Sequence, residues 1–120
     1  MQYMLLIHDD EQLWQSLSEV ELGRLYQAYG AVTEEMQAAG AFVAGDQLQP
    51  TSAATTVRER DGERLITDGP FAETKEQLGG YYLVEAESLD EAIEWAGKLP
   101  SVKYGSIEVR PIVVREGVPA

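Results

Sequence analysis

The 120-residue sequence contains no cysteine, and this absence excludes disulfides, thiolate catalysis, cysteine zinc sites and iron-sulfur clusters. Basic residues are scarce: nine Lys and Arg side chains stand against 21 Asp and Glu, so the formal net charge is −12 at pH 7. Nucleic acid and anionic membranes would repel such a chain, and we expect neither as a partner. No apolar run approaches the length of a membrane span, and the N-terminus lacks the basic flank and the cleavage site of a signal peptide. These absences favour a cytoplasmic protein.

The composition is that of one globular domain covering residues 1–120. Apolar residues make up 44% of the chain and charged residues 25%, and no linker, repeat or low-complexity stretch divides it. Area scaling indicates that folding removes roughly two thirds of the surface of the extended chain from water. The chain is therefore long enough to bury one core.

Two segments have the capping residues and the apolar spacing of amphipathic helices. Ser18 and Glu21 form a capping box, and the apolar stripe that follows runs to Gly40, which is suited to the left-handed end of a helix. The same capping spacing recurs at residues 88–91, and Pro100 ends that second stripe. We predict one helix over each stripe.

Short apolar runs predict strands at residues 3–7, 41–45, 81–86 and 106–114. Pro111 cannot donate to a strand ladder, so the last strand should lie at a sheet edge or contain a bulge. Residues 55–67 flank Asp61-Gly62, a dipeptide suited to a type I′ turn, and predict a hairpin that lies at an edge or projects. Its register would place Arg60 opposite Glu63, Glu59 opposite Arg64 and Val57 opposite Ile66, with two favourable charge pairs.

Without the hairpin, the element order is βαββαβ, which predicts an α+β ferredoxin-like fold with both helices on one sheet face. The strands at residues 3–7 and 81–84 are apolar at consecutive positions, as expected for strands that are covered on both faces. We infer that a second copy covers the open face and forms a homodimeric α/β barrel. The alternative is a monomer with a partly apolar exposed sheet.

The run Asp68-Gly69-Pro70-Phe71-Ala72-Glu73-Thr74-Lys75-Glu76 resembles the signature of the DGPF-domain proteins, a branch of the YCII-related group. The likeness extends to residues 3–7, to Gly79-Gly80-Tyr81-Tyr82 and to Glu108-Val109-Arg110-Pro111, and thus covers nearly the whole chain. The resemblance implies a dimeric α+β barrel and no known reaction. Such proteins are often encoded beside extracytoplasmic-function sigma factors, which implies a possible regulatory context linked to a sigma factor.

The wider YCII-related group resembles a set of small enzymes or pseudo-enzymes that carry a His-Asp pair near the dimer cleft. In that group the histidine lies about eleven residues before the glycine that ends the first helix. That position is Tyr29 in this sequence, and the predicted helix contains no histidine. Asp68 matches the acidic partner, so the pair is incomplete.

Asp68 is the candidate catalytic residue, because a carboxylate in a water-poor barrel mouth can move protons. Alternatively, its carboxylate makes an Asx-type turn by accepting from backbone N–H groups two residues on. Lys75 and Arg110 are candidate cations for a small acidic ligand, whereas solvated or internal pairing, such as Arg110 with Glu108, is the alternative. Phe71 is expected as a plug in the core, and a stacking platform is its alternative.

His8, the single histidine, ends the first predicted strand. Together with Tyr29, Lys75 and Arg110 it is a candidate ligand-binding residue. Metal binding with Asp9 and Asp10 is disfavoured, because successive side chains on an extended segment point to opposite sides. We expect no cofactor. The leading hypothesis is a small-ligand-binding or regulatory dimer with its cleft near the Asp68–Glu76 loop. The alternative is a cofactor-free lyase, isomerase or hydrolase acting on a small organic acid.

Overall fold

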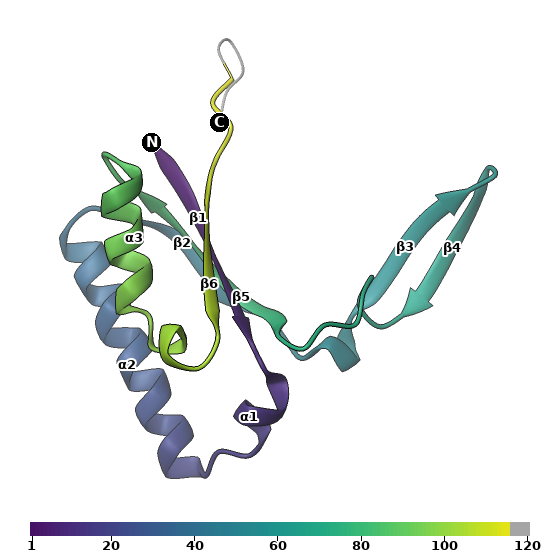
Figure 1. The fold of residues 1–120 in the computed structure, drawn as a ribbon, viewed down its shortest axis with the longest axis horizontal. Helices are drawn as coiled ribbons and strands as arrows, with labels where there is room; N and C mark the ends of the chain where they lie inside the picture. The colour runs from purple at the N-terminus through teal and green to yellow at the C-terminus, as the bar shows by residue number, and fades with distance from the viewer. Residues whose placement is uncertain (116–120) are drawn as a thin grey trace.

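Four antiparallel strands form the central sheet of the computed structural model, which describes residues 1–115, and a separate hairpin projects from it (Figure 1). The sheet has the order β2-β5-β1-β6, in which every neighbouring pair is antiparallel. Its strands are β1 (Gln2–Asp9), β2 (Phe42–Gln47), β5 (Gln77–Glu85) and β6 (Ser106–Pro111). The helices are α1 (Glu11–Gln15), α2 (Glu19–Ala38) and α3 (Leu89–Lys98), with 3-10 turns η1 (Thr51–Ala53) and η2 (Pro100–Lys103). The predicted α+β class is confirmed.

The two long helices begin at the predicted caps. Ser18 accepts from the Glu21 amide at 3.1 Å while the Glu21 carboxylate accepts from the Ser18 amide, so the capping box of α2 is complete. Ser88 likewise accepts from the Glu91 amide and caps α3. Gly40 follows α2 with φ +71°, the left-handed conformation that glycine adopts without strain.

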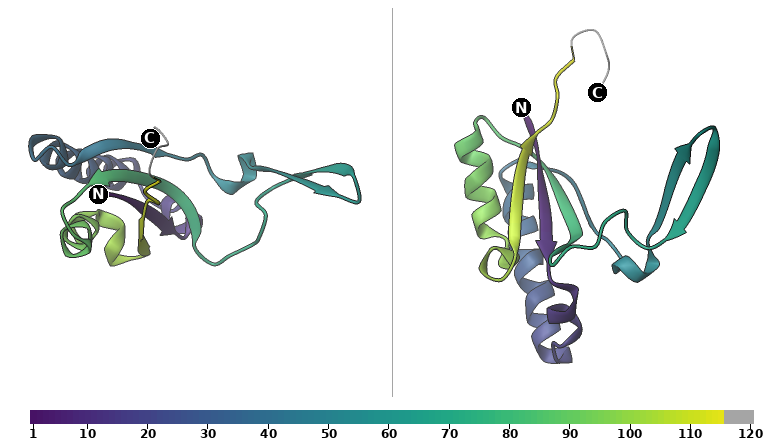
Figure 2. Two further views of the ribbon diagram at one scale, coloured as in Figure 1. Left: turned by 90° about the horizontal axis from the view of Figure 1, so that it is seen from above. Right: turned by 45° about the vertical axis from the view of Figure 1, so that its right-hand side comes forward.

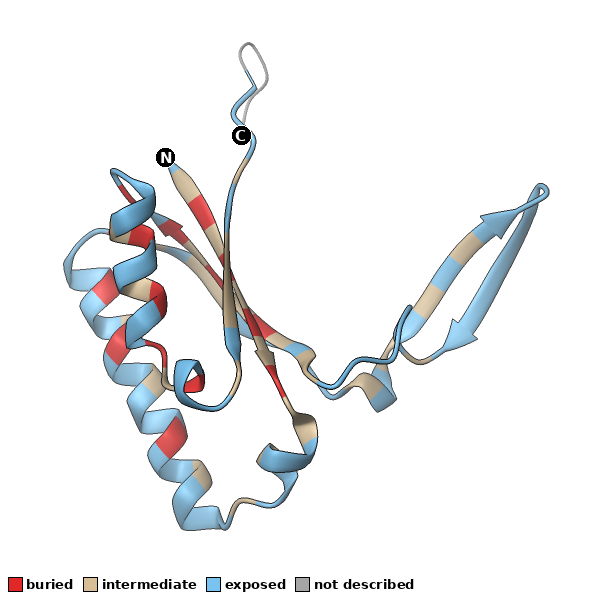
Figure 3. Cartoon of the chain, viewed as in Figure 1, coloured by how far each residue is buried: buried red, intermediate tan, exposed pale blue. Residues whose placement is uncertain are grey.

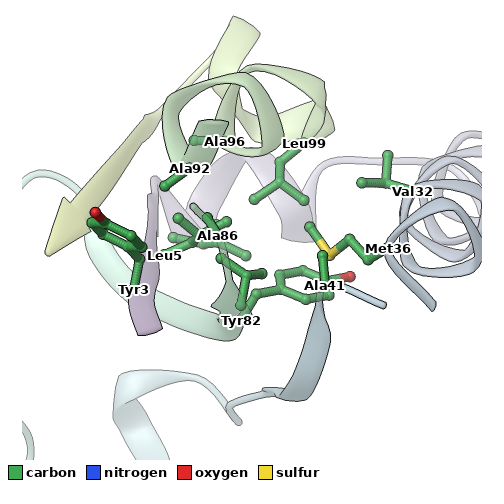
Figure 4. Packing of buried hydrophobic residues seen from close by; sticks show 12 residues of the cluster. Tyr3, Leu5, Val32, Met36, Ala41, Tyr82, Ala86, Ala92, Ala96 and Leu99 are labelled. Atoms are coloured by element: carbon green, nitrogen blue, oxygen red, sulfur yellow. The ribbon is translucent and has the colours of Figure 1, made fainter. Parts of the chain in front are cut away.

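One core cluster joins both long helices to one face of the sheet (Figures 3 and 4). Along β1 the residues are alternately half-buried and buried, and its buried members are Tyr3, Leu5, Ile7 and Asp9. Tyr3, Leu5 and Ile7 pack in one cluster with Val32 and Met36 of α2 and with Ala92 and Ala96 of α3. The remaining side chains of β1, at positions 2, 4, 6 and 8, therefore lie on the opposite face, which no helix of the described chain covers.

The hairpin of β3 (Thr55–Arg60) and β4 (Glu63–Asp68) extends away from the helices in both orientations (Figure 2). Its predicted register is confirmed, including the Val57–Ile66 pair, and Asp61 and Gly62 both have the positive φ of a type I′ turn. The two expected charge pairs do not form ion pairs in residues 1–115. Arg60 donates instead to a neighbouring backbone carbonyl, which shows how little exposed pairs constrain their side chains.

Several boundaries differ from those predicted. The last strand ends at Pro111 rather than at residue 114, and it is an edge strand, as the proline indicates. The strand predicted at residues 81–86 begins earlier, at Gln77, so Gly79 and Gly80 lie inside β5. Phe71 is 79% exposed, so its expected role as a core plug is wrong for the single chain. Within the described part of the chain, no helix is long and apolar enough to span a membrane.

Candidate functional site

A cavity of about 380 Å³ lies where the end of β1 meets α1, α2 and the β2–β5 half of the sheet. Pockets that hold small molecules begin at about 300 Å³, so this space suits a compact ligand of about one ring. The residues that follow the Asp68–Glu76 loop, from Gln77 onward, form part of its wall. The cavity therefore borders β5, the strand that directly follows the loop that carries the DGPF run.

Aromatic rings form much of the cavity wall. Trp14 of α1 lies edge-on to Tyr26, with ring centroids 5.9 Å apart, and at 6.4 Å from the ring of Tyr29. Phe42 and Tyr82 meet edge-to-face at 6.2 Å on the sheet side. All five rings line the cavity. Such walls bind flat apolar groups through dispersion and edge-to-face contacts.

A buried carboxylate lies in this wall at the end of β1. Asp9 is only 5% exposed, and its Oδ2 accepts from Trp14 Nε1 at 3.0 Å and from Ser101 Oγ at 2.6 Å. The side-chain direction follows from strand alternation, because Asp9 continues the buried series of β1. Both donors are neutral, so the carboxylate is hydrogen-bonded without a counter-ion.

Tyr29 extends this network by one hydrogen bond to Ser101. Ser101 has a single hydroxyl proton, which it donates to Asp9, so Tyr29 must be the donor to Ser101. Burial raises the pKa of the Tyr29 hydroxyl to about 12, with a further contribution from the nearby Asp9 carboxylate. The Tyr29 hydroxyl therefore stays protonated at neutral pH and donates its hydrogen bond to Ser101.

The other oxygen of Asp9, Oδ1, is buried and has no hydrogen-bond donor among the described residues. Gly105 lies against it, since a Cβ at Gly105 would overlap both Asp9 Oδ1 and the carbonyl oxygen of His8. Any larger residue at this position would have to displace the carboxylate. Because Gly105 has no side chain, it leaves room for the Asp9 carboxylate in this position.

Glu11 makes hydrogen bonds that hold α1 in place at the rim of the cavity. Its carboxylate accepts from the amide of Thr51 at 2.7 Å and from the Thr51 hydroxyl at 2.8 Å, which connects α1 to η1. The Glu11 amide donates to Gln77 Oε1 at 2.9 Å and connects α1 to the start of β5. The short helix α1, capped by Asp10, is therefore fixed on both sides of the opening.

Comparison with known proteins gives a family match over the same part of the chain. Residues 1–115 match the model of the YCII-related domain. The chain belongs to the YCII-related family. An uncharacterized protein of Rhizobium meliloti (strain 1021) is similar to it at 41% identity over 116 residues, covering 95% of this chain and 94% of that protein.

Of the residues that the sequence suggested for the site of this YCII-related protein, Tyr29 lines the cavity. Its nearest carboxylate through hydrogen bonds is Asp9, by way of Ser101, and not Asp68. Asp68 is the exposed last residue of β4, on the projecting hairpin and outside the cavity lining. The Asx-type turn does not form either, because the residue two positions on is Pro70, which has no N–H.

His8 and Arg110 lie on the uncovered face of the sheet, away from the cavity. Glu108 bridges them: its Oε1 is 3.3 Å from His8 Nε2, and its Oε2 accepts from Arg110 Nε at 3.1 Å. Arg110 thus makes the internal pair, and its hydrogen bonds lower the pKa of Glu108. Lys75 is exposed in the loop before β5 and does not line the cavity. No cluster of three metal-ligating side chains occurs among residues 1–115.

The main site residues that the sequence reasoning did not find in the YCII-related protein are Asp9, Trp14 and Ser101. From the sequence, Asp9 is considered only in a disfavoured metal site with His8 and Asp10. The period-two series Tyr3, Leu5, Ile7 and Asp9 carries the missing signal, since it places Asp9 on the buried face. Ser101 lies 92 positions away from Asp9 in sequence, and no local pattern connects the two.

Proposed function

We propose that this YCII-related protein is a homodimeric small-molecule-binding protein whose ligand occupies the cavity beside Asp9 and Tyr29. The observation that carries the proposal is a cavity of about 380 Å³ with aromatic walls and a hydrogen-bonded buried carboxylate. Cavities that combine apolar walls with a few converging polar groups are the usual form of ligand sites. The Asp68–Glu76 loop supports the same location, because it leads directly into the cavity wall at Gln77.

Ligand binding agrees better with the geometry than the alternative of an enzyme that uses Asp68 with Lys75 or Arg110. That mechanism needs the Asp68 carboxylate in a water-poor pocket with a cation within reach. In the single chain Asp68 is exposed on the hairpin, and Arg110 is paired with Glu108 on the uncovered sheet face. The three residues therefore lie in separate places.

The uncovered sheet face supports the homodimer. Cross-strand partners point to the same side, and Leu6 lies opposite Tyr81 while Met4 lies opposite Leu83. These four side chains are only half-buried, although they form the centre of a four-stranded sheet. A second copy packed face to face would remove them from water. The strand order also supports the ferredoxin-like arrangement from which such barrels form.

The test of ligand binding uses a neutral single-ring probe, tyrosol, and amide chemical shifts of the isotope-labelled protein. Gly79 and Gly80 line the cavity, and the indole N–H of Trp14 donates to Asp9, so all three should shift saturably with the probe. Gly62 at the hairpin tip and Gly97 in α3 serve as controls in the same spectrum, because neither lines the cavity.

Shifts confined to the cavity signals, with one common dissociation constant, are the expected result. If tyrosol and its amine and carboxylate analogues all leave these signals in place at 10 mM, or if tyrosol shifts the control glycines equally, the cavity is not a ligand site.

A further inference from the structure

The charged residues that line the cavity are all acidic: they are Asp9, Glu11 and Asp46, and no Lys, Arg or His occurs among the described residues of the lining. The Asp46 carboxylate itself lies on the other face of the sheet, where it accepts from the hydroxyl of its cross-strand partner Tyr81 at 3.2 Å. The Glu11 carboxylate is held by Thr51, so Asp9 is the buried carboxylate on the cavity side. A small acid, the ligand class suggested by the sequence, would enter this space without meeting a cation.

Asp9 contributes most to the negative potential, because it is the most deeply buried of the three. It receives hydrogen bonds only from neutral groups, and its second oxygen receives none in the described chain. Charges in a partly dehydrated site interact more strongly than charges in water, and salt screens them less. The net charge of −12 for the whole chain adds to the same sign.

The aromatic rings favour ligands of the same charge type. Trp14, Tyr26 and Tyr29 form a connected group of rings above the Asp9 end of the cavity. The electron-rich faces of such rings attract ammonium and guanidinium groups. Carboxylates and aromatic faces in one cavity are the combination that recognises an organic cation.

We infer that the cavity takes a single-ring or similarly compact molecule that carries a protonated amine, and that it discriminates against carboxylates. This inference rests on the proposed function and names the chemical class of its ligand. The aromatic part of the ligand packs on the Trp14 group, and its ammonium lies within the field of Asp9.

Three probes that share a phenol ring and differ at the end of a short chain test this inference. Tyramine ends in an ammonium, tyrosol in a hydroxyl and 4-hydroxyphenylacetate in a carboxylate. At pH 7 we expect tyramine to bind at least tenfold more tightly than the carboxylate, with tyrosol between them, as measured by the cavity amide shifts. At an effective dielectric near 20, one unit charge about 12 Å away already gives about a tenfold ratio, so tenfold is the lower limit for an ammonium inside the cavity.

Asp9→Asn keeps the shape of the side chain and removes its charge, so it should reduce the ratio between tyramine and the carboxylate at least threefold. The matched control is Asp61→Asn at the hairpin tip, where asparagine accepts the positive φ of 54° and the ratio should not change. If Asp9→Asn does not fold, Glu11→Gln at the cavity rim replaces it, because glutamine keeps an acceptor for Thr51, and it should reduce the ratio about twofold.

The outcomes separate the two proposals. If tyrosol binds but tyramine is no tighter than the carboxylate, the ligand class is wrong and the binding cavity stands. An amine preference that Asp9→Asn and Glu11→Gln both leave intact also overturns the inference, because the preference then has another origin. If none of the three probes shifts the cavity signals, the binding cavity itself fails.

Discussion

Removal of the Ser101 hydroxyl is the sharpest perturbation of the site, because this group joins Tyr29 to Asp9. Ser101→Ala deletes the bond to the Asp9 carboxylate and leaves the Tyr29 hydroxyl without its acceptor. Hydrogen bonds to charged groups contribute about 1.5–3 kcal/mol and neutral ones about 0.5–1.5 kcal/mol. Ser101 is fully buried, so water cannot replace its hydroxyl at no cost. We therefore expect the free energy of unfolding to fall by about 2–4 kcal/mol.

Thermal and urea unfolding measure this loss. For a domain of this length, each kcal/mol lost from the free energy of unfolding lowers the midpoint temperature by about 4 °C, so the midpoint should fall by about 8–16 °C. Ser106→Ala is the matched control, since the exposed Ser106 hydroxyl donates only to Glu76, and its effect should stay within about 0.5 kcal/mol. Tyr29→Phe added to Ser101→Ala should cost little more, because their shared bond is already lost. Equal midpoints for Ser101→Ala and Ser106→Ala would refute the network as a stabilising element.

Three further predictions follow from the fold and the site. Gly105→Ala places a methyl group against the buried Asp9 carboxylate and should lower the free energy of unfolding in urea by about 1–3 kcal/mol. Gly97→Ala, in open space on α3, should instead raise it by about 0.5–1 kcal/mol, and equal effects of the two variants would contradict the crowding at Gly105. Because the pKa of Tyr29 rises from 10 to about 12 on folding, the folded state retains a proton that the unfolded state loses, so stability should fall as pH rises from 10 to 12. Tyr29→Phe should remove that slope, and an unchanged slope would count against the shift. Leu6→Glu on the uncovered sheet face should convert the proposed dimer to monomers in light scattering, while Val20→Glu, exposed in the first turn of α2, should leave the dimer intact. If the Leu6→Glu protein is still a dimer, this face is not the dimer interface.

Local chemistry accounts for the parts of the fold that the sequence predicts. The capping box at Ser18 and the Asp61-Gly62 turn each depend on residues within four positions, and both form as expected. The register of the hairpin follows from the turn, because a two-residue loop fixes which residues of the two strands pair and places Val57 opposite Ile66. These elements need no information from distant parts of the chain.

The candidate site depends on contacts that no local pattern contains. Tyr29 was found through its position before Gly40, whereas its partner Ser101 comes from the turn after α3. The five-residue helix α1 escaped prediction, because its acidic start resembles a loop, and it carries the Trp14 ring. Asp68 was favoured for its place in a recognisable run, but the hairpin carries it away from the cavity.

Intermolecular nuclear Overhauser effects between tyrosol and the protein test most directly whether the cavity is the ligand site. The ring protons of bound tyrosol should show contacts to Trp14 of α1 and Phe42 of β2, both of which line the cavity. Contacts to Leu6 or His8 on the other face of the sheet, with none to Trp14, would contradict a ligand site beside Asp9.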